Sequence, residues 1–97
     1  MRKIQVQPQA RLDLLEIWHF IARESVQSAS RVTDTIEAEI RELATMPGKG
    51  HTRSDVRDDR YRFWSVFSWV IAYRYDEKTL TVVRVVHGHR NFRKLFK

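Results

Sequence analysis

Two histidines and a group of cations follow the last apolar stretch of the chain, and these residue types could do chemistry. The histidines flank a glycine in HGHRN, residues 87–91, and no acid occurs from residue 84 to residue 97. Histidine titrates near neutral pH and could serve as a general base, whereas arginine could hold a phosphate group. The cations here are Arg90, Arg93, Lys94 and Lys97. The segment could therefore hold a metal, catalyse a reaction or bind an anion.

The pattern disfavours both metal binding and catalysis by these histidines. His87 and His89 would share one face only in a continuing strand, and Gly88 indicates that the strand ends there. The chain has no cysteine to complete a ligand set, and no motif places a serine or a carboxylate beside either histidine. We therefore expect no metal and no cofactor, and we favour a hydrogen-bonded place at a strand end for His87.

Charge is distributed unevenly along the 97 residues, a length that suits one domain. The net charge is +6, which favours an anionic partner such as nucleic acid or an acidic protein. Residues 10–46 hold four arginines against seven acids, whereas residues 47–62 hold five cations against three acids, and residues 84–97 hold five cations. Because no run is apolar enough for a membrane span or a signal peptide, and no cysteine is present, we expect a cytoplasmic protein.

The first half of the sequence predicts a strand and two helices. KIQVQ, residues 3–7, alternates apolar and polar residues, and the proline that follows ends this strand. From Gln9 onward apolar residues recur at helical spacing until Ser25 or Ser28, either of which could cap a second helix. That helix ends at MPGKG, residues 46–50. The short connection predicts an antiparallel helical hairpin.

The second half predicts three strands. A polar loop over residues 48–60 precedes an aromatic and β-branched stretch, residues 61–75, which favours strands. This stretch is too long for one strand, so we divide it near residues 66–68. A turn over residues 76–79 and a last strand over residues 80–87 follow. The fold class is α+β, in the order β-α-α-β-β-β, with the helical hairpin on one face of a mostly antiparallel four-stranded sheet.

Three stretches together resemble a known family. They are ARLDLLEIWHFIA (10–22), WVIAYRYD (69–76) and VVRVVHGHRN (82–91). In this order and spacing they are similar to the ParE branch of the RelE/ParE superfamily, the toxins of type II toxin–antitoxin operons. The resemblance spans nearly the whole chain and implies the fold that the element order predicts.

The resemblance implies one of two activities. RelE-like members cut messenger RNA on the ribosome without a metal, using basic residues to stabilise the phosphate and a group in the tail, such as an aromatic hydroxyl, to assist proton movement. ParE-like members lack that set and inhibit DNA gyrase. The two branches therefore differ in residues that this sequence can be checked for.

Most of the nuclease residues are missing from this sequence. Val70 stands where a RelE-type nuclease has an arginine, and YRFW supplies only Arg62 where a nuclease has lysines. Arg90 matches the family's arginine after the last strand, but the tail aromatic is Phe92 or Phe96, neither of which has a hydroxyl. The ParE branch therefore fits better. The remaining catalytic candidates are Arg62, His87 and Arg90.

We accordingly expect a toxin that binds and poisons DNA gyrase and forms a hetero-oligomer with a small acidic antitoxin. The alternatives are a ribosome-dependent mRNA endoribonuclease with a reduced active site, and a degenerate toxin that keeps only antitoxin binding. Target or antitoxin binding is assigned to exposed apolar residues of the first helix and to polar residues of the second half. They are Leu12, Leu15, Phe20, Arg74, Arg84, His89, Arg90, Arg93 and Lys94.

The C-terminal tail is expected to contact a partner and to lie outside the core. Phe92, Leu95 and Phe96 occur at i, i+3 and i+4, which predicts a short helical turn with its cations in water. Removal of residues 91–97 would then leave a folded domain. Whether the strand arginines share one face stays open at this point, because a register slip of one residue reverses the face.

Overall fold

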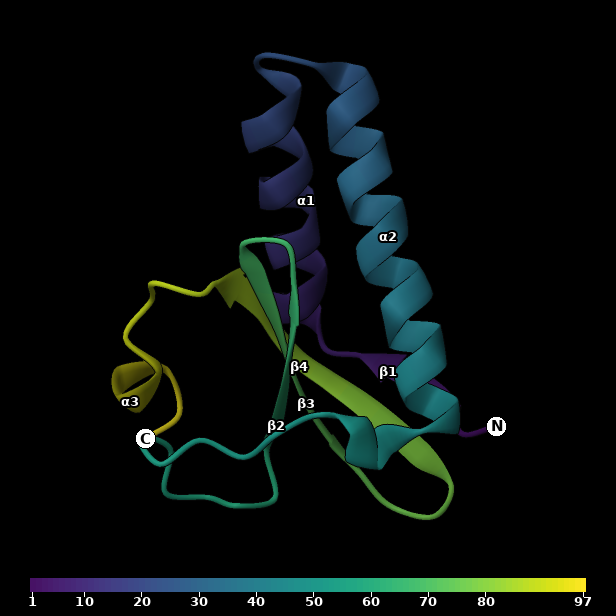
Figure 1. Ribbon diagram of the computed structural model, residues 1–97, viewed down its shortest axis with the longest axis vertical. Coiled ribbons are helices and arrows are strands. Elements are labelled where there is room, and N and C mark those ends of the chain that lie inside the picture. The colour runs from purple at the N-terminus through teal and green to yellow at the C-terminus, as the bar shows by residue number, and fades with distance from the viewer.

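The computed structural model describes all residues, 1–97, as a four-stranded sheet with two long helices on one side of it (Figure 1). The strands are β1 (Lys3–Val6), β2 (Arg62–Val66), β3 (Trp69–Tyr75) and β4 (Thr79–His87). The helices are α1 (Pro8–Ala22), α2 (Val26–Thr45), the short 3-10 helix η1 (Pro47–Lys49) and α3 (Phe92–Leu95). The α+β class and the order β-α-α-β-β-β are confirmed, and no helix has the length and apolar character needed to cross a membrane.

The strands lie in the order β1-β4-β3-β2. β1 is parallel to β4, whereas β3 is antiparallel to both of its neighbours, β2 and β4, so the sheet is mostly antiparallel as predicted. The long aromatic stretch divides where expected, because β2 ends at Val66 and β3 begins at Trp69. Phe67, in the two-residue turn between them, has a φ of 55°. This left-handed conformation at the first turn position is one that hairpins usually give to glycine.

The helical hairpin is fixed by a cap at the start of α2 and by a hydrogen bond between its two helices. Ser25 is the N-cap of α2, and its hydroxyl accepts a hydrogen bond from the Ser28 backbone N–H at 3.1 Å. The alternative cap, Ser28, lies inside the helix. Trp18 of α1 donates its indole N–H to the Ser30 hydroxyl of α2 at 3.3 Å. The outer half of the hairpin projects beyond the sheet (Figure 1).

The main core lies between the helices and the sheet. Helix residues such as Ile17, Ile36 and Leu43 pack there against strand residues such as Ile71. Tyr73 is fully buried among them, and its hydroxyl donates to the Pro47 carbonyl and accepts from the Gly50 backbone N–H. Desolvation by this burial raises the pKa of Tyr73. A strand residue thereby also fixes the turn that follows α2.

A second core lies on the opposite face of the sheet, and the C-terminal tail is part of it. Phe92 and Phe96 are only 1% and 8% exposed, and they pack on Phe63 with ring centroids 5.6 and 5.5 Å away. Val70 and Val86 belong to the same cluster. The expectation that the tail lies outside the core is therefore wrong for its two phenylalanines, although the short helical turn that carries them is confirmed.

A buried carboxylate joins α1 to the free part of β4. β1 pairs with β4 only as far as Val82, so the backbone of β4 has no strand neighbour on that side beyond this point. Asp13, 4% exposed, accepts there from the Val85 backbone N–H at 2.9 Å. It also accepts from Nε and Nη2 of Arg84 at 2.8 and 3.0 Å. The carboxylate thus replaces a missing strand and neutralises an arginine.

Replacing Asp13 with alanine should lower the free energy of unfolding by about 3 kcal/mol, because it leaves a buried N–H and a charged guanidinium without a partner. Glu16→Ala, an exposed change on the same helix with no ion pair, should stay within about 0.5 kcal/mol of the parent. Urea unfolding of both variants at low and high salt measures this. A loss for Asp13→Ala no larger than that of the control would show that the contact does not secure the helix.

Phe92→Ala should lower the free energy of unfolding by about 3–5 kcal/mol, because it opens a cavity in the second core. Lys94→Ala, on the exposed side of the same short helix, should change it by no more than about 0.5 kcal/mol. Thermal and urea melts give the comparison. Equal stability of the two variants would mean that the tail is not part of the core.

Candidate functional site

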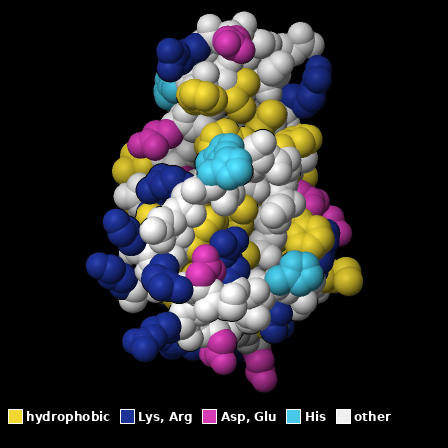
Figure 2. All heavy atoms as spheres, turned by 60° about the vertical axis from the view of Figure 1, so that its left-hand side comes forward, with side chains coloured by type: hydrophobic (Ala, Val, Ile, Leu, Met, Phe, Trp, Pro, Cys, Tyr) yellow, Lys and Arg dark blue, Asp and Glu magenta, His cyan; other side chains and the backbone are white.

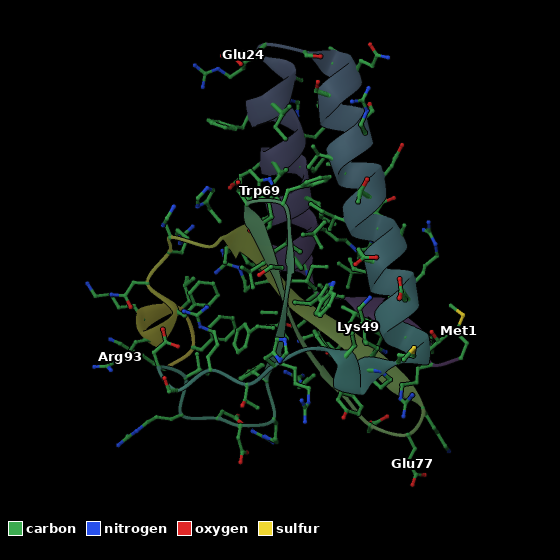
Figure 3. All side chains as sticks on the ribbon, viewed as in Figure 1. Met1, Glu24, Lys49, Trp69, Glu77 and Arg93 are labelled. Atoms are coloured by element: carbon green, nitrogen blue, oxygen red, sulfur yellow. The ribbon has the colours of Figure 1, made fainter.

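A cleft of about 270 Å³ lies between α1 and the end of β4. Three residues expected from the sequence, Phe20, His87 and Arg90, line it together. Trp69 also lines it, at the tip of the β2–β3 hairpin where Figure 3 shows it beside α1. Glu16 adds a carboxylate. Asp13 lines it too, but is paired with Arg84. The cleft therefore combines aromatic walls with one free cation and one free acid, which suits a partner side chain of mixed character.

His87 is packed as a half-buried residue at the end of its strand. Its ring meets Trp69 edge-on at 5.2 Å and stacks on His89 at 4.8 Å. Its Nδ1 accepts from the His89 backbone N–H at 3.2 Å, which agrees with the structural role favoured from the sequence. His89 itself is exposed. No group of three His, Asp or Glu side chains is placed to hold a metal ion.

The three strand arginines do not form one basic patch. Arg62 pairs with Tyr73 across the β2–β3 ladder, and its Nη1 donates to the Gly50 carbonyl at 3.0 Å. Arg74 is the next residue of β3 and so points to the opposite face. The hydrogen bonds from Arg84 to Asp13 raise the pKa of its guanidinium. Arg84 was expected to bind a partner, but its charge is used inside the fold.

The nuclease candidates are also separated. Trp69 pairs with His87 at the turn end of the hairpin, whereas Arg62 lies at the other end of the same ladder. Only His87 and Arg90 line the same cleft. Val70, at the place of the nuclease arginine, is 6% exposed in the apolar cluster that contains Phe92 and Phe96. An apolar core therefore occupies the position at which the resemblance to RelE-type nucleases implies an arginine.

Several large apolar side chains point into solvent. Leu12, Leu15 and Phe20 of α1 are 52%, 57% and 63% exposed, as expected from the sequence. Phe67 is 65% exposed at the hairpin tip, and the sequence analysis missed it. Its only signal was the turn expected near residues 66–68, and a turn does not show which way a side chain faces. Exposed apolar groups of this size favour contact with another protein.

The cations of the tail lie outside the second core. Arg90, Arg93, Lys94 and Lys97 are all exposed. Figure 3 shows Arg93 at the outer side of α3, and Figure 2 shows Lys and Arg side chains gathered along one side of this face. Hydrophobic side chains gather above them in the same view, beside the histidines. The tail thus turns its aromatic residues inward and its charges outward.

Comparison with known proteins agrees with this architecture. The sequence model of the ParE toxin of type II toxin–antitoxin system, parDE, matches residues 4–92. A structure of the chromosomal ParDE TA system from P. aeruginosa superposes with a TM-score of 0.73 at 17% identity, covering 90% of this chain and 96% of that one. The toxin–antitoxin complex RelBE2 from Mycobacterium tuberculosis gives a TM-score of 0.68 at 17% identity, covering 89% and 96%. No curated protein sequence matches.

The two structural likenesses are too distant in sequence to show more than the fold, but the family match spans nearly the whole chain. It includes α1, nearly the whole sheet, His87 and His89 and the start of the tail. The chain belongs to the ParE toxin family of type II toxin–antitoxin systems.

Proposed function

We propose that this toxin inhibits growth by binding DNA gyrase and does not cut messenger RNA, and that a cognate antitoxin neutralises it. The burial of Val70 carries the first part of the proposal. Phosphoryl transfer depends on cations placed around the phosphate, and here the corresponding place is filled by valine and covered by Phe92 and Phe96. The site lacks room for a phosphate as well as a charge to hold it.

Binding remains as the mechanism, and the cleft is the best candidate for the target contact. Trp69, Phe20 and Arg90 offer large apolar surfaces beside a free guanidinium, and aromatic residues and arginine dominate the energetics of protein interfaces. His87 is held by Trp69 and His89, so its ring presents a fixed surface. A toxin that acts in this way needs no proton transfer, and the lack of a tail hydroxyl carries no penalty.

Purified toxin should inhibit supercoiling by gyrase and should leave messenger RNA uncut in a translation extract followed by primer extension. Arg90→Glu should weaken inhibition about tenfold, as expected for the loss of 1.4 kcal/mol of binding. Arg31→Glu, an exposed arginine on α2, serves as the control. Ribosome-dependent cutting without an effect on gyrase would refute the proposal. In that case Tyr61, whose ring lies 5.1 Å from Phe96, would be the first hydroxyl to remove.

The outer face of α1 is the proposed antitoxin contact. Leu12 and Leu15 stand one helical turn apart and are more than half exposed. A partner segment that folds on binding could cover them with its own apolar side chains. The P. aeruginosa ParDE and M. tuberculosis RelBE2 structures are of a toxin–antitoxin system and a toxin–antitoxin complex, which supports such a partner here.

Co-expression with the product of the adjacent gene should yield a complex that Leu12→Gln and Leu15→Gln each weaken about tenfold or more, the cost of losing an apolar anchor. Val26→Gln is a matched control, because Val26 is equally exposed at the far end of the hairpin. Calorimetry on the purified pair measures the affinities. An unchanged affinity in both leucine variants would place the antitoxin elsewhere.

A further inference from the structure

We propose that the loop over residues 53–60 and the tail over residues 90–97 form a sequence-independent site for the phosphate backbone of duplex DNA. The site is separate from the Leu12 and Leu15 face of α1. It combines Arg93, which the sequence analysis assigned to partner binding, with Arg57 and Lys97, which it left unassigned. It does not depend on gyrase being the target, because it concerns direct contact between this chain and DNA.

The site centres on a hollow of about 580 Å³ between the loop and the tail. Three cations line it, Arg57 from the loop and Arg93 and Lys97 from the tail. Phe96 is its one apolar residue, and Asp55 is its one acid. Arg57 and Lys97 also line the adjoining hollow beside Tyr61, so the positive surface continues past Phe96.

Two of the three acids of the loop are paired with arginines outside the hollow, although Asp55 also feels the charge of Arg93. Asp55 is paired with Arg53 at 2.9 Å and Asp58 with Arg60 at 2.7 Å. The partner arginines lower the pKa of both carboxyl groups, that of Asp58 to about 2. No carboxylate lies within ion-pair distance of the three cations that line the hollow. Asp59 is the one unpaired acid of the loop.

The chemistry of this surface fits nucleic acid better than protein. A protein interface needs apolar anchors at its centre, and every large exposed apolar side chain of the molecule lies outside the loop and the tail. Phe92, Phe96 and Val56 are all turned into the second core. Protein–DNA interfaces are polar and strongly positive. The side chains that the loop and the tail expose to solvent have this character.

The same inward packing favours a duplex over a single strand. Proteins that bind single strands stack the bases on exposed aromatic rings. Here Phe92 and Phe96 stack on each other at 6.2 Å and edge-on against Phe63, and Arg53 covers Phe92 at 3.9 Å. The surface therefore offers cations without stacking platforms. A duplex suits it, because a duplex presents phosphates outward and keeps its bases inside.

Fluorescence anisotropy with short duplexes of two unrelated sequences tests the site. Both should bind alike, with a logarithmic salt slope of about −3 if three phosphates are neutralised at about 0.9 per contact. The triple variant Arg57→Gln, Arg93→Gln, Lys97→Gln should lose most of that slope. A control variant with three exposed arginines substituted on and beside the helices, Arg23→Gln, Arg31→Gln and Arg41→Gln, removes the same charge. It should keep the salt slope of the parent protein. Asp59→Asn should tighten binding.

Four results would overturn the inference: no binding at low salt, equal loss in both triples, tighter binding of single strands or duplex RNA, or displacement of DNA by poly-glutamate at equal charge. All substituted side chains are exposed, and matching melting temperatures confirm that the variants are folded. Gyrase inhibition is measured separately. A toxin that inhibits gyrase without binding DNA would leave the proposed function standing and remove this inference alone.

Discussion

A sheet with two apolar faces needs cover on both, and the two long helices reach only one of them. The helical hairpin buries the face that carries Ile71 and Tyr73. The face that carries Phe63 and Val70 is buried by the last residues of the chain and by Val56 of the loop. Without this second layer, apolar strand residues would meet water at a cost of about 25 cal/mol for each Å² exposed. The loop and the tail are held against this face of the sheet by these apolar contacts.

This arrangement separates the surfaces by chemical character. Because the tail packs its phenylalanines against the sheet, its cations face the solvent. There they lie near the cations of the loop. The large apolar side chains that remain exposed lie outside the loop and the tail, most of them on the long helices and at the tip of the β2–β3 hairpin. One molecule can thus present an apolar face to a protein and a cationic face to an anion, without competition between them. The cleft of Phe20, Trp69 and Arg90 combines both characters.

Local patterns predicted the fold well because helices, caps and turns depend on neighbouring residues. The apolar spacing of α2, the cap at Ser25 and the division of the aromatic stretch all required only short-range information. The contacts that were missed join distant parts of the chain. Arg84 donates to Asp13, which lies 71 residues earlier in the chain. The helical turn at Phe92 was predicted, but its packing against Phe63 was not. Such pairs depend on strand register, which a single sequence does not determine.

The carboxylate that anchors α1 also affects how the molecule behaves beside its own copies. An open strand edge is a template for pairing with another chain and hence for aggregation. Asp13 occupies the backbone N–H of Val85 where β1 has ended. At the far edge of the sheet, His51 exchanges two backbone hydrogen bonds with Phe63 of β2. Both edges are thereby shortened as templates for pairing with another copy of this chain.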